Sequence, residues 1–176
     1  MLLLLRNLFW TILIPGAVTV YLPSLILGPT PFPESWELLQ WLVLPFAATG
    51  TVILLYCIVT FGITGRGTLS PLDAPRRLVV RGLYRYVRNP MYCGVLLILL
   101  AEDGFFRSIA LLQYTAGWLI FIHLVVVFYE EPALRRRFGD SYDDYYRVVR
   151  RWLPGKPYDM TSTRSDGQKP QGLPYQ

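Results

Sequence analysis

The segment YRYVRNPMYCG, residues 84–94, places two arginines and three tyrosines around an Asn-Pro pair that leads into an apolar run. Asn is a preferred N-cap residue and Pro a preferred first helical residue, so the segment predicts a helix that begins at Asn89-Pro90. The free N–H groups and the dipole of a helix N-terminus attract anions, and Arg88 would add a full positive charge. Gly94, one turn into the helix, would allow a ligand or another backbone to approach closely. The segment is equally typical of a capped helix with arginines and tyrosines at the lipid headgroups, so both interpretations stay open.

A second candidate group is the acidic pair Glu130-Glu131, which directly follows the apolar stretch VVVFY. Two carboxylates at a helix C-terminus oppose the helix dipole, and acids close to hydrocarbon are costly. Such acids indicate function by default, although pairing with Arg135 or with arginines of a preceding loop would give them a structural role. As a functional pair, they would suit a ligand that carries a cationic group.

His123 is the single histidine of the chain and lies seven residues before Glu130, on roughly the same helix face. Its side chain would either hydrogen-bond to a neighbouring helix or line a cavity above Glu130. No second His or Cys stands at ligand spacing, so we expect no metal site. Cys57 and Cys93 fall in or beside apolar segments without a disulfide pattern, and we interpret them as packing residues.

Taken together, arginines with a helix N-terminus on one side and two carboxylates on the other would suit a zwitterionic ligand. Such a ligand carries both a carboxylate and a cationic centre. The chain has no P-loop pattern, no GxSxG motif and no dinucleotide fingerprint after a strand. These absences argue against a nucleotide hydrolase or a soluble dehydrogenase.

The composition indicates that these residues belong to an integral membrane protein. Of 176 residues, 53% are apolar and 16% are charged, and the mean hydropathy is +0.35. A soluble domain carries about 25% charged residues, and a bilayer core requires about 20 apolar residues of helix. We therefore predict an all-α integral membrane bundle of about four transmembrane helices within one domain, residues 1–153. The predicted spans lie near residues 8–27, 38–63, 90–103 and 108–130.

The basic residues predict the orientation of these spans. The loop between the first two spans contains no Lys or Arg, and the turn between the third and fourth contains only Arg107. All other basic residues fall at the N-terminus, in the loop before Asn89 or after the fourth span. By the positive-inside rule, both termini are cytoplasmic. The net charge of +5 then reflects membrane orientation, and we expect no nucleic-acid partner.

The C-terminal region divides into two parts. Residues 138–152 carry apolar or aromatic residues at helical spacing and arginines toward the end, which predicts an amphipathic helix at the membrane interface. Asp140 or Ser141 would cap its start. From Pro154 on, the sequence is rich in Pro, Gly, Ser and Gln, and we predict a disordered tail over residues 154–176.

Two motifs in this order resemble a known family. GLYRYVRNPMYCG (82–94), followed by a span and then YEEPALRRRFGDSYDDYYRVVRRWLP (129–154), is similar to the isoprenylcysteine carboxyl methyltransferase-like and phospholipid N-methyltransferase group. The resemblance covers about residues 70–154, and the first two spans match only as generic membrane helices. It implies an integral membrane enzyme that binds S-adenosyl-L-methionine at its C-terminal helices. It also implies membrane lipids and a lipophilic or lipidated substrate, entering from the bilayer, as partners.

The resemblance also implies roles for particular residues. Those expected around the cofactor are Tyr84, Arg88, Asn89, Tyr92 and Gly94, with Glu130 and Glu131 near the cofactor or the reacting centre. His123 is added as a cofactor-binding candidate from its position above Glu130, and not from the resemblance. A carboxylate acceptor needs no base, whereas an amine must lose a proton, for which Glu130 or Glu131 is the candidate. Arg135, one turn later, would orient an anionic acceptor. Asn89 replaces a His of the better-known members (RHPxYxG), and because Asn does not titrate near neutral pH, we expect binding rather than proton transfer there.

Two other functions remain open at this level. A sterol-reductase-like membrane enzyme that uses NADPH would have a related C-terminal architecture. A non-catalytic module that binds anionic lipids through the basic face would also fit the charge distribution. The leading hypothesis is methyl transfer from S-adenosyl-L-methionine to a lipophilic carboxylate or amine at the cytoplasmic face of the membrane.

Overall fold

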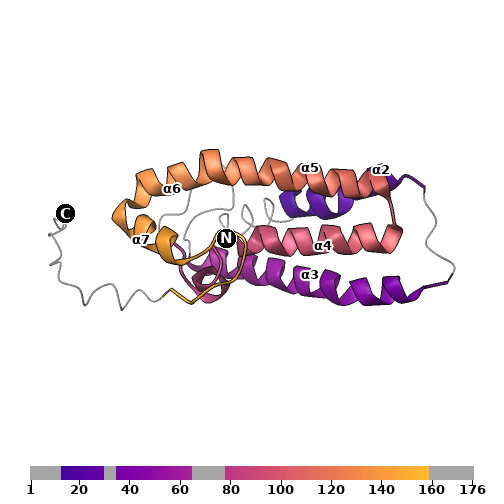
Figure 1. Cartoon of the computed structure of the whole chain (residues 1–176), viewed down its shortest axis with the longest axis horizontal. Coiled ribbons are helices and arrows are strands. Elements are labelled where there is room, and N and C mark those ends of the chain that lie inside the picture. The colour runs from indigo at the N-terminus through magenta and orange to yellow at the C-terminus, as the bar shows by residue number, and fades with distance from the viewer. Residues whose placement is uncertain (1–12, 30–34, 65–77, 159–176) are drawn as a thin grey trace.

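The structure is a computed structural model that describes residues 13–29, 35–64 and 78–158, with the side chains of residues 61–64 left aside. Its described secondary structure is helical, as predicted, and Val87 and Arg150 add one isolated parallel bridge (Figure 1). The elements are η1 (Ala17–Tyr21), α2 (Leu22–Leu27), α3 (Leu38–Thr64), η2 (Gly82–Arg85), α4 (Pro90–Phe106), α5 (Ile109–Val125), η3 (Val126–Glu130), α6 (Glu131–Phe138) and α7 (Asp140–Val148).

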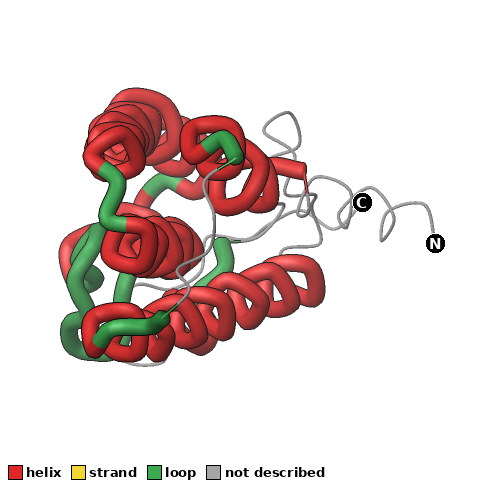
Figure 2. The backbone as a smooth tube through the Cα atoms, turned by 90° about the vertical axis from the view of Figure 1, so that its right-hand side faces the viewer, coloured by secondary structure: helices red, strands yellow, loops and turns green. Residues whose placement is uncertain are grey.

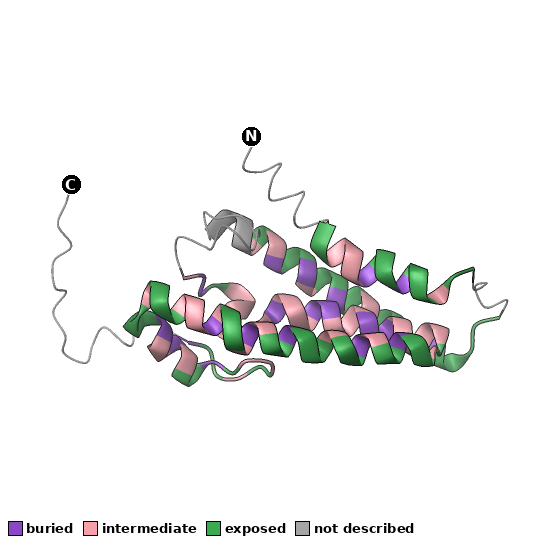
Figure 3. Cartoon of the chain, turned by 90° about the horizontal axis from the view of Figure 1, so that it is seen from above, coloured by how far each residue is buried: buried purple, intermediate pink, exposed green. Residues whose placement is uncertain are grey.

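Two helices are long and apolar enough to cross a membrane. They are Leu38–Thr60, with a mean hydropathy of 2.3, and Ile109–Phe138, with a mean hydropathy of 1.9. Most of their apolar side chains are exposed, for example Ile120 and Phe121 on α5, and Figure 3 shows exposed positions along the outer side of that helix. Apolar surface of this extent requires an apolar solvent, which a bilayer provides. The predicted span at residues 90–103 falls within the shorter helix α4, and the described part of the predicted span at 8–27 falls in the helical segment Leu13–Leu27, with residues 8–12 outside the described part of the chain. A count of four spans remains a prediction.

Helices α3, α4 and α5 lie side by side in that order, with α2 against α5 (Figures 1 and 2). The α3–α4 contact is close because glycines face each other across it. A Cβ atom on Gly94 would lie 2.9 Å from the carbonyl oxygen of Gly50, and one on Gly50 would lie 2.6 Å from the oxygen of Gly94. Small residues at such positions allow two membrane helices to pack backbone against backbone. The sequence allows either a ligand or another backbone to approach Gly94, and in the structure the backbone of α3 does so.

Helix α4 begins at Pro90 with Asn89 as its N-cap residue, which confirms the predicted start. It ends at Arg107, whose φ of 50° lies in the left-handed region, and Ser108 then caps α5 by accepting a hydrogen bond from the Leu111 N–H. At this end of the bundle Arg107 pairs with Glu37, 2.5 Å away. Arg107, which the predicted spans place on the opposite side from the other basic residues, thus lies in this turn.

The helix that begins with α5 continues through the π-helical turn η3 into α6 and ends at Gly139, with a φ of 52°. The predicted amphipathic helix is correspondingly shorter. It is α7, Asp140–Val148, with Gly139 as N-cap residue and no side-chain cap from Asp140 or Ser141. The chain becomes extended at Val149, with φ −95° and ψ 128°.

Residues 149–158, here named the C-terminal strap, run along the loop that precedes α4. The Arg88 N–H donates to the Arg150 carbonyl at 2.9 Å, and the Gly155 N–H donates to the Tyr86 carbonyl at 3.0 Å. Tyr158 is buried with Val80, Tyr142, Tyr145 and Val149 in a small core. The prediction of disorder from Pro154 on is therefore wrong for residues 154–158, because aromatic packing and backbone pairing order them. Residues 159–176 lie outside the described part of the chain.

Candidate functional site

The two adjacent glutamates lie at the junction between a π-helical turn and the next helix, and both have protein partners. Glu130 is the last residue of η3, and Glu131 is the first residue of α6. A π turn widens the helix locally and is frequent at functional sites. Here the Tyr92 hydroxyl donates to Oε1 of Glu130, while the Glu131 side chain turns toward arginines. Glu131 is 7% exposed and is thus a buried carboxylate.

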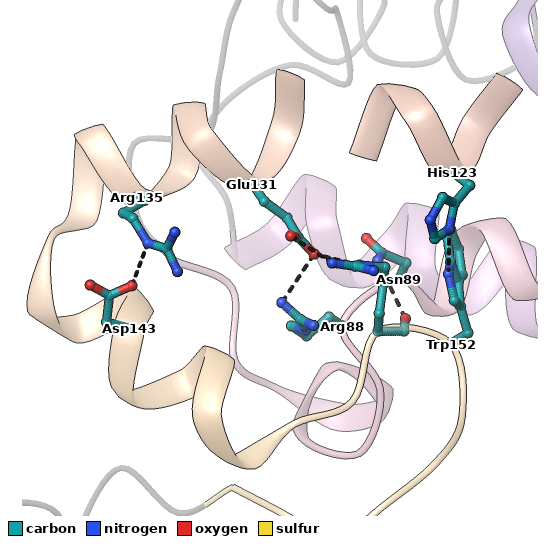
Figure 4. A network of polar contacts seen from close by, with 8 residues as sticks. Arg88, Asn89, His123, Glu131, Arg135, Asp143 and Trp152 are labelled. Carbon is teal, nitrogen blue, oxygen red and sulfur yellow. Dashed lines mark hydrogen bonds and ion pairs between the residues drawn. The ribbon is translucent and has the colours of Figure 1, made fainter. Parts of the chain in front are cut away.

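Glu131 is held by two arginines from segments distant in the sequence. Arg88, from the loop before α4, places Nη1 3.0 Å from Glu131 Oε1. Arg151, from the C-terminal strap, binds in a bidentate manner, with Nε 2.7 Å from Oε1 and Nη2 2.9 Å from Oε2. This pairing raises the pKa of Arg151, mainly through its hydrogen bonds to Glu131. The sequence leaves open whether the glutamates pair with loop arginines, and Glu131 does pair with Arg88. Figure 4 shows this contact.

Arg88 is buried yet incompletely satisfied. Its guanidinium carbon lies 4.0 Å from the centre of the Tyr146 ring, a cation–π distance. Its Nε and Nη1 atoms are buried and donate no hydrogen bond to any residue that the structure describes. The ion pair with Glu131 is thus a close charge contact without a well-directed hydrogen bond. Buried donors without partners are rare and indicate a missing ligand, ion or water.

Asn89 does not use its side chain as a helix cap. Its Nδ2 donates to the Arg151 carbonyl at 3.3 Å, and the backbone of the residue alone serves as the N-cap. The amide therefore ties the start of α4 to the C-terminal strap. The expectation that Asn89 binds the cofactor rather than transferring a proton stays a prediction, because in this structure its amide donates to the protein itself.

A cavity of about 80 Å³ lies beside these groups. Its lining joins the loop before α4, the η3–α6 junction and α7, and consists of Leu78, Val79, Tyr84, Arg88, Asn89, Val126, Glu130, Glu131, Leu134, Tyr142 and Tyr145. The Tyr145 hydroxyl donates to the Tyr84 carbonyl at 2.6 Å. Burial raises the pKa of both Tyr84 and Tyr145, so the two phenols stay protonated at neutral pH.

Four predicted site residues lie outside the lining of this cavity. Tyr92 reaches the site only through its hydroxyl, which donates to Glu130. Gly94 packs on α3, as described above. His123 accepts a hydrogen bond at Nδ1 from the Trp152 indole, 3.2 Å away, which is the neighbour contact that one interpretation expected, although the partner is the strap and not a helix (Figure 4). Arg135 pairs with Asp143 at 2.6 Å and has a half-exposed side chain, so its guanidinium is directed to α7 (Figure 4).

Sequence reasoning missed several residues of the site. The sequence predicts an aromatic face on the helix that is now α7. It does not predict that Tyr142 and Tyr145 line the cavity or that the Tyr146 ring lies against Arg88. From the sequence, Arg151 is only one of several arginines near the end of a predicted helix. Its spacing from the preceding motif gives no signal, because its contact with Glu131 depends on how the strap folds back.

The fold and the site define an all-helical membrane protein with a buried cluster of opposite charges beside a small cavity. In a comparison with known protein families, residues 39–141 match the phospholipid methyltransferase family, and the chain belongs to this family. Membership implies a methyltransferase of membrane lipids. No curated protein sequence and no solved structure matches the chain. The match includes Arg88 and Glu131 and ends before Arg151.

Proposed function

We propose that the protein transfers a methyl group from S-adenosyl-L-methionine to a lipophilic acceptor at the cytoplasmic face of the membrane. The observation that carries this proposal is the position of Arg88, a buried cation whose Nε has no hydrogen-bond partner among the described residues, beside Glu130 and Glu131 at one cavity. The family membership supplies the reaction class. The charged groups supply a reason for this particular cofactor.

The residues present fit the cofactor in chemical kind. S-adenosyl-L-methionine carries a carboxylate, for which the buried Nε of Arg88, with no hydrogen-bond partner among the described residues, is a suitable donor. It also carries an ammonium and a sulfonium, which carboxylates and aromatic faces favour. The cavity of about 80 Å³ is smaller than the roughly 300–1,000 Å³ of ordinary ligand pockets. Binding therefore requires the site to widen.

The chain's own residues supply binding, orientation and a proton acceptor. The cofactor, when bound, supplies a methyl group activated by the positive sulfur, and the transfer depends mainly on alignment and exclusion of water. For an amine acceptor, Glu130 is the better candidate for accepting the proton. Among the described residues, its hydrogen-bond partner is the Tyr92 hydroxyl, whereas both oxygens of Glu131 are held by guanidinium groups. Arg135 would have to leave Asp143 before it could orient an anionic acceptor.

The distribution of charge along the bundle supports the cytoplasmic placement of the site. Arg107 lies at the turn between α4 and α5, whereas the basic residues of η2, α6, α7 and the strap lie at the opposite end (Figure 1). The positive-inside rule assigns that opposite end, and with it the cavity, to the cytoplasm. A bundle of four spans would then place both termini on the same side.

Calorimetric titration of the detergent-purified protein with S-adenosyl-L-methionine tests the proposal. We expect binding by the wild type and weaker binding by Arg88→Gln, since this change removes the donors for the cofactor carboxylate. Arg136→Gln is the matched control, because Arg136 is an exposed arginine of α6. Absence of binding at millimolar cofactor would refute the proposal. If the protein binds the cofactor, transfer of labelled methyl groups to a lipid extract would show whether the acceptor is a carboxylate or an amine.

A further inference from the structure

The Glu131 carboxylate has no free place for a ligand cation in this structure. Its two oxygens receive three N···O contacts of 3.0 Å or less, one from Arg88 and two from Arg151. A cofactor ammonium or sulfonium that approaches Glu131 would meet a guanidinium already in position. The anion-binding half of the site differs, because Arg88 keeps buried N–H donors that no described residue accepts.

The two arginines on Glu131 differ in their freedom to leave. The Arg88 side chain is 9% exposed and lies against the Tyr146 ring, so it is largely shielded from water. The Arg151 side chain is 23% exposed and belongs to the edge of the site. Its backbone is held independently, since the Asn89 amide donates to its carbonyl and the Arg88 N–H donates to the carbonyl of Arg150. The Arg151 guanidinium can therefore turn outward while the strap stays in place.

We propose that Arg151 is an autoinhibitory gate that occupies the cation position on Glu131 in the ligand-free protein. When the ligand binds, its positive group replaces the Arg151 guanidinium, which turns toward solvent. Arg88 stays and binds the ligand carboxylate. This inference rests on the proposed function, since it assumes that the ligand is S-adenosyl-L-methionine.

The gate makes Arg151→Gln an unusual substitution, because loss of a site residue should strengthen binding. The wild type must break two charge-assisted hydrogen bonds before Glu131 can accept the ligand, and the variant need not. Because the Arg151 side chain is partly exposed, these bonds are of moderate strength, and we expect a gain of roughly tenfold in affinity. Calorimetry with S-adenosyl-L-methionine on the full chain in detergent measures this gain directly.

Matched variants separate the gate from a general effect of charge. Arg150→Gln removes the same charge from the neighbouring, exposed residue of the strap, and we expect an unchanged dissociation constant. In a Glu131→Gln background the gain should vanish, so that the double variant with Arg151→Gln binds no more tightly than Glu131→Gln alone. Arg151→Lys keeps the charge but loses the bidentate geometry, and it should give a smaller gain.

The outcomes distinguish the gate from the proposed function. If the wild type binds and Arg151→Gln binds equally or more weakly, the gate is refuted and the proposed function stands. If neither protein binds at millimolar cofactor, both are refuted. If the gain persists in the Glu131→Gln background, Arg151 acts on another group and the gate is again refuted. Should Arg151→Gln fail to fold, as judged by gel filtration and circular dichroism, Arg151→Lys provides the same comparison.

Discussion

Glu131→Gln tests whether the buried carboxylate organises its two arginines. The substitution keeps the shape of the side chain and removes its charge. Arg88, with a side chain that is 9% exposed, then loses its ion-pair partner and remains buried. Breaking a buried ion pair by neutralising one partner costs about 3–5 kcal/mol, because an uncompensated charge stays in a medium of low polarity. We expect a value of about 3 kcal/mol, since the glutamine oxygen can still accept a hydrogen bond.

The same physical argument predicts how much variants of Arg151 and Arg147 destabilise the protein. Arg151→Gln leaves Glu131 paired with Arg88 and removes hydrogen bonds from a partly exposed partner, so we expect a cost of about 1 kcal/mol. Arg147→Gln should cost almost nothing, because its side chain is 78% exposed and lies 4.0 Å from Asp144. The expected order of destabilisation is therefore Glu131→Gln, then Arg151→Gln, then Arg147→Gln.

Unfolding in mixed micelles, with sodium dodecyl sulfate as denaturant and circular dichroism as readout, measures these differences. If Arg151→Gln destabilises the protein as much as Glu131→Gln does, the buried charge of Arg88 is not the dominant cost and the reasoning fails. A double variant, Glu131→Leu with Arg88→Met, is a further check. It removes both charges, so it should be more stable than Glu131→Gln.

The remaining predictions concern packing, buried phenols and the strap. Gly94→Ala should lower the free energy of unfolding by about 1–3 kcal/mol, because its Cβ would lie 2.9 Å from an α3 carbonyl oxygen. Gly117→Ala in α5 is the control: its Cβ would meet nothing within 4 Å, so the same assay should show no loss of stability or a small gain. Burial raises the pKa of Tyr84 and Tyr145 above the ordinary value of about 10. Their stabilising contribution is therefore complete below that pH and is lost as the pH rises toward the folded-state values, and Tyr145→Phe should make this alkaline loss shallower. Tyr158→Ala should loosen the C-terminal strap, seen as faster amide exchange at the Gly155 and Tyr158 N–H groups, whereas unchanged exchange would show that the backbone pairing alone holds it.

The candidate site shows where local patterns stop being informative. The Asn-Pro pair predicts the start of α4 correctly because capping depends on a few consecutive residues. It does not predict that the Asn89 amide binds the Arg151 carbonyl, 62 residues away. Likewise, the acidic pair stands out because carboxylates beside apolar residues are costly, but the sequence offers many arginines as partners and no rule for choosing among them.

The sequence by itself determines the all-helical membrane character, the positions of the main helices and the two charged motifs. Hydropathy, capping and charge distribution are properties of consecutive residues, so they can be read without coordinates. The tertiary structure alone decides that Arg88 and Arg151 meet on Glu131, that Gly94 faces α3 and that residues 154–158 are ordered. The meeting of the arginines on Glu131 involves a strap that folds back beside α4, and the Gly94 contact involves the packing of α4 on α3. Both bring together segments whose separation along the chain carries no local signal, which is why Arg151 emerged only from the structure.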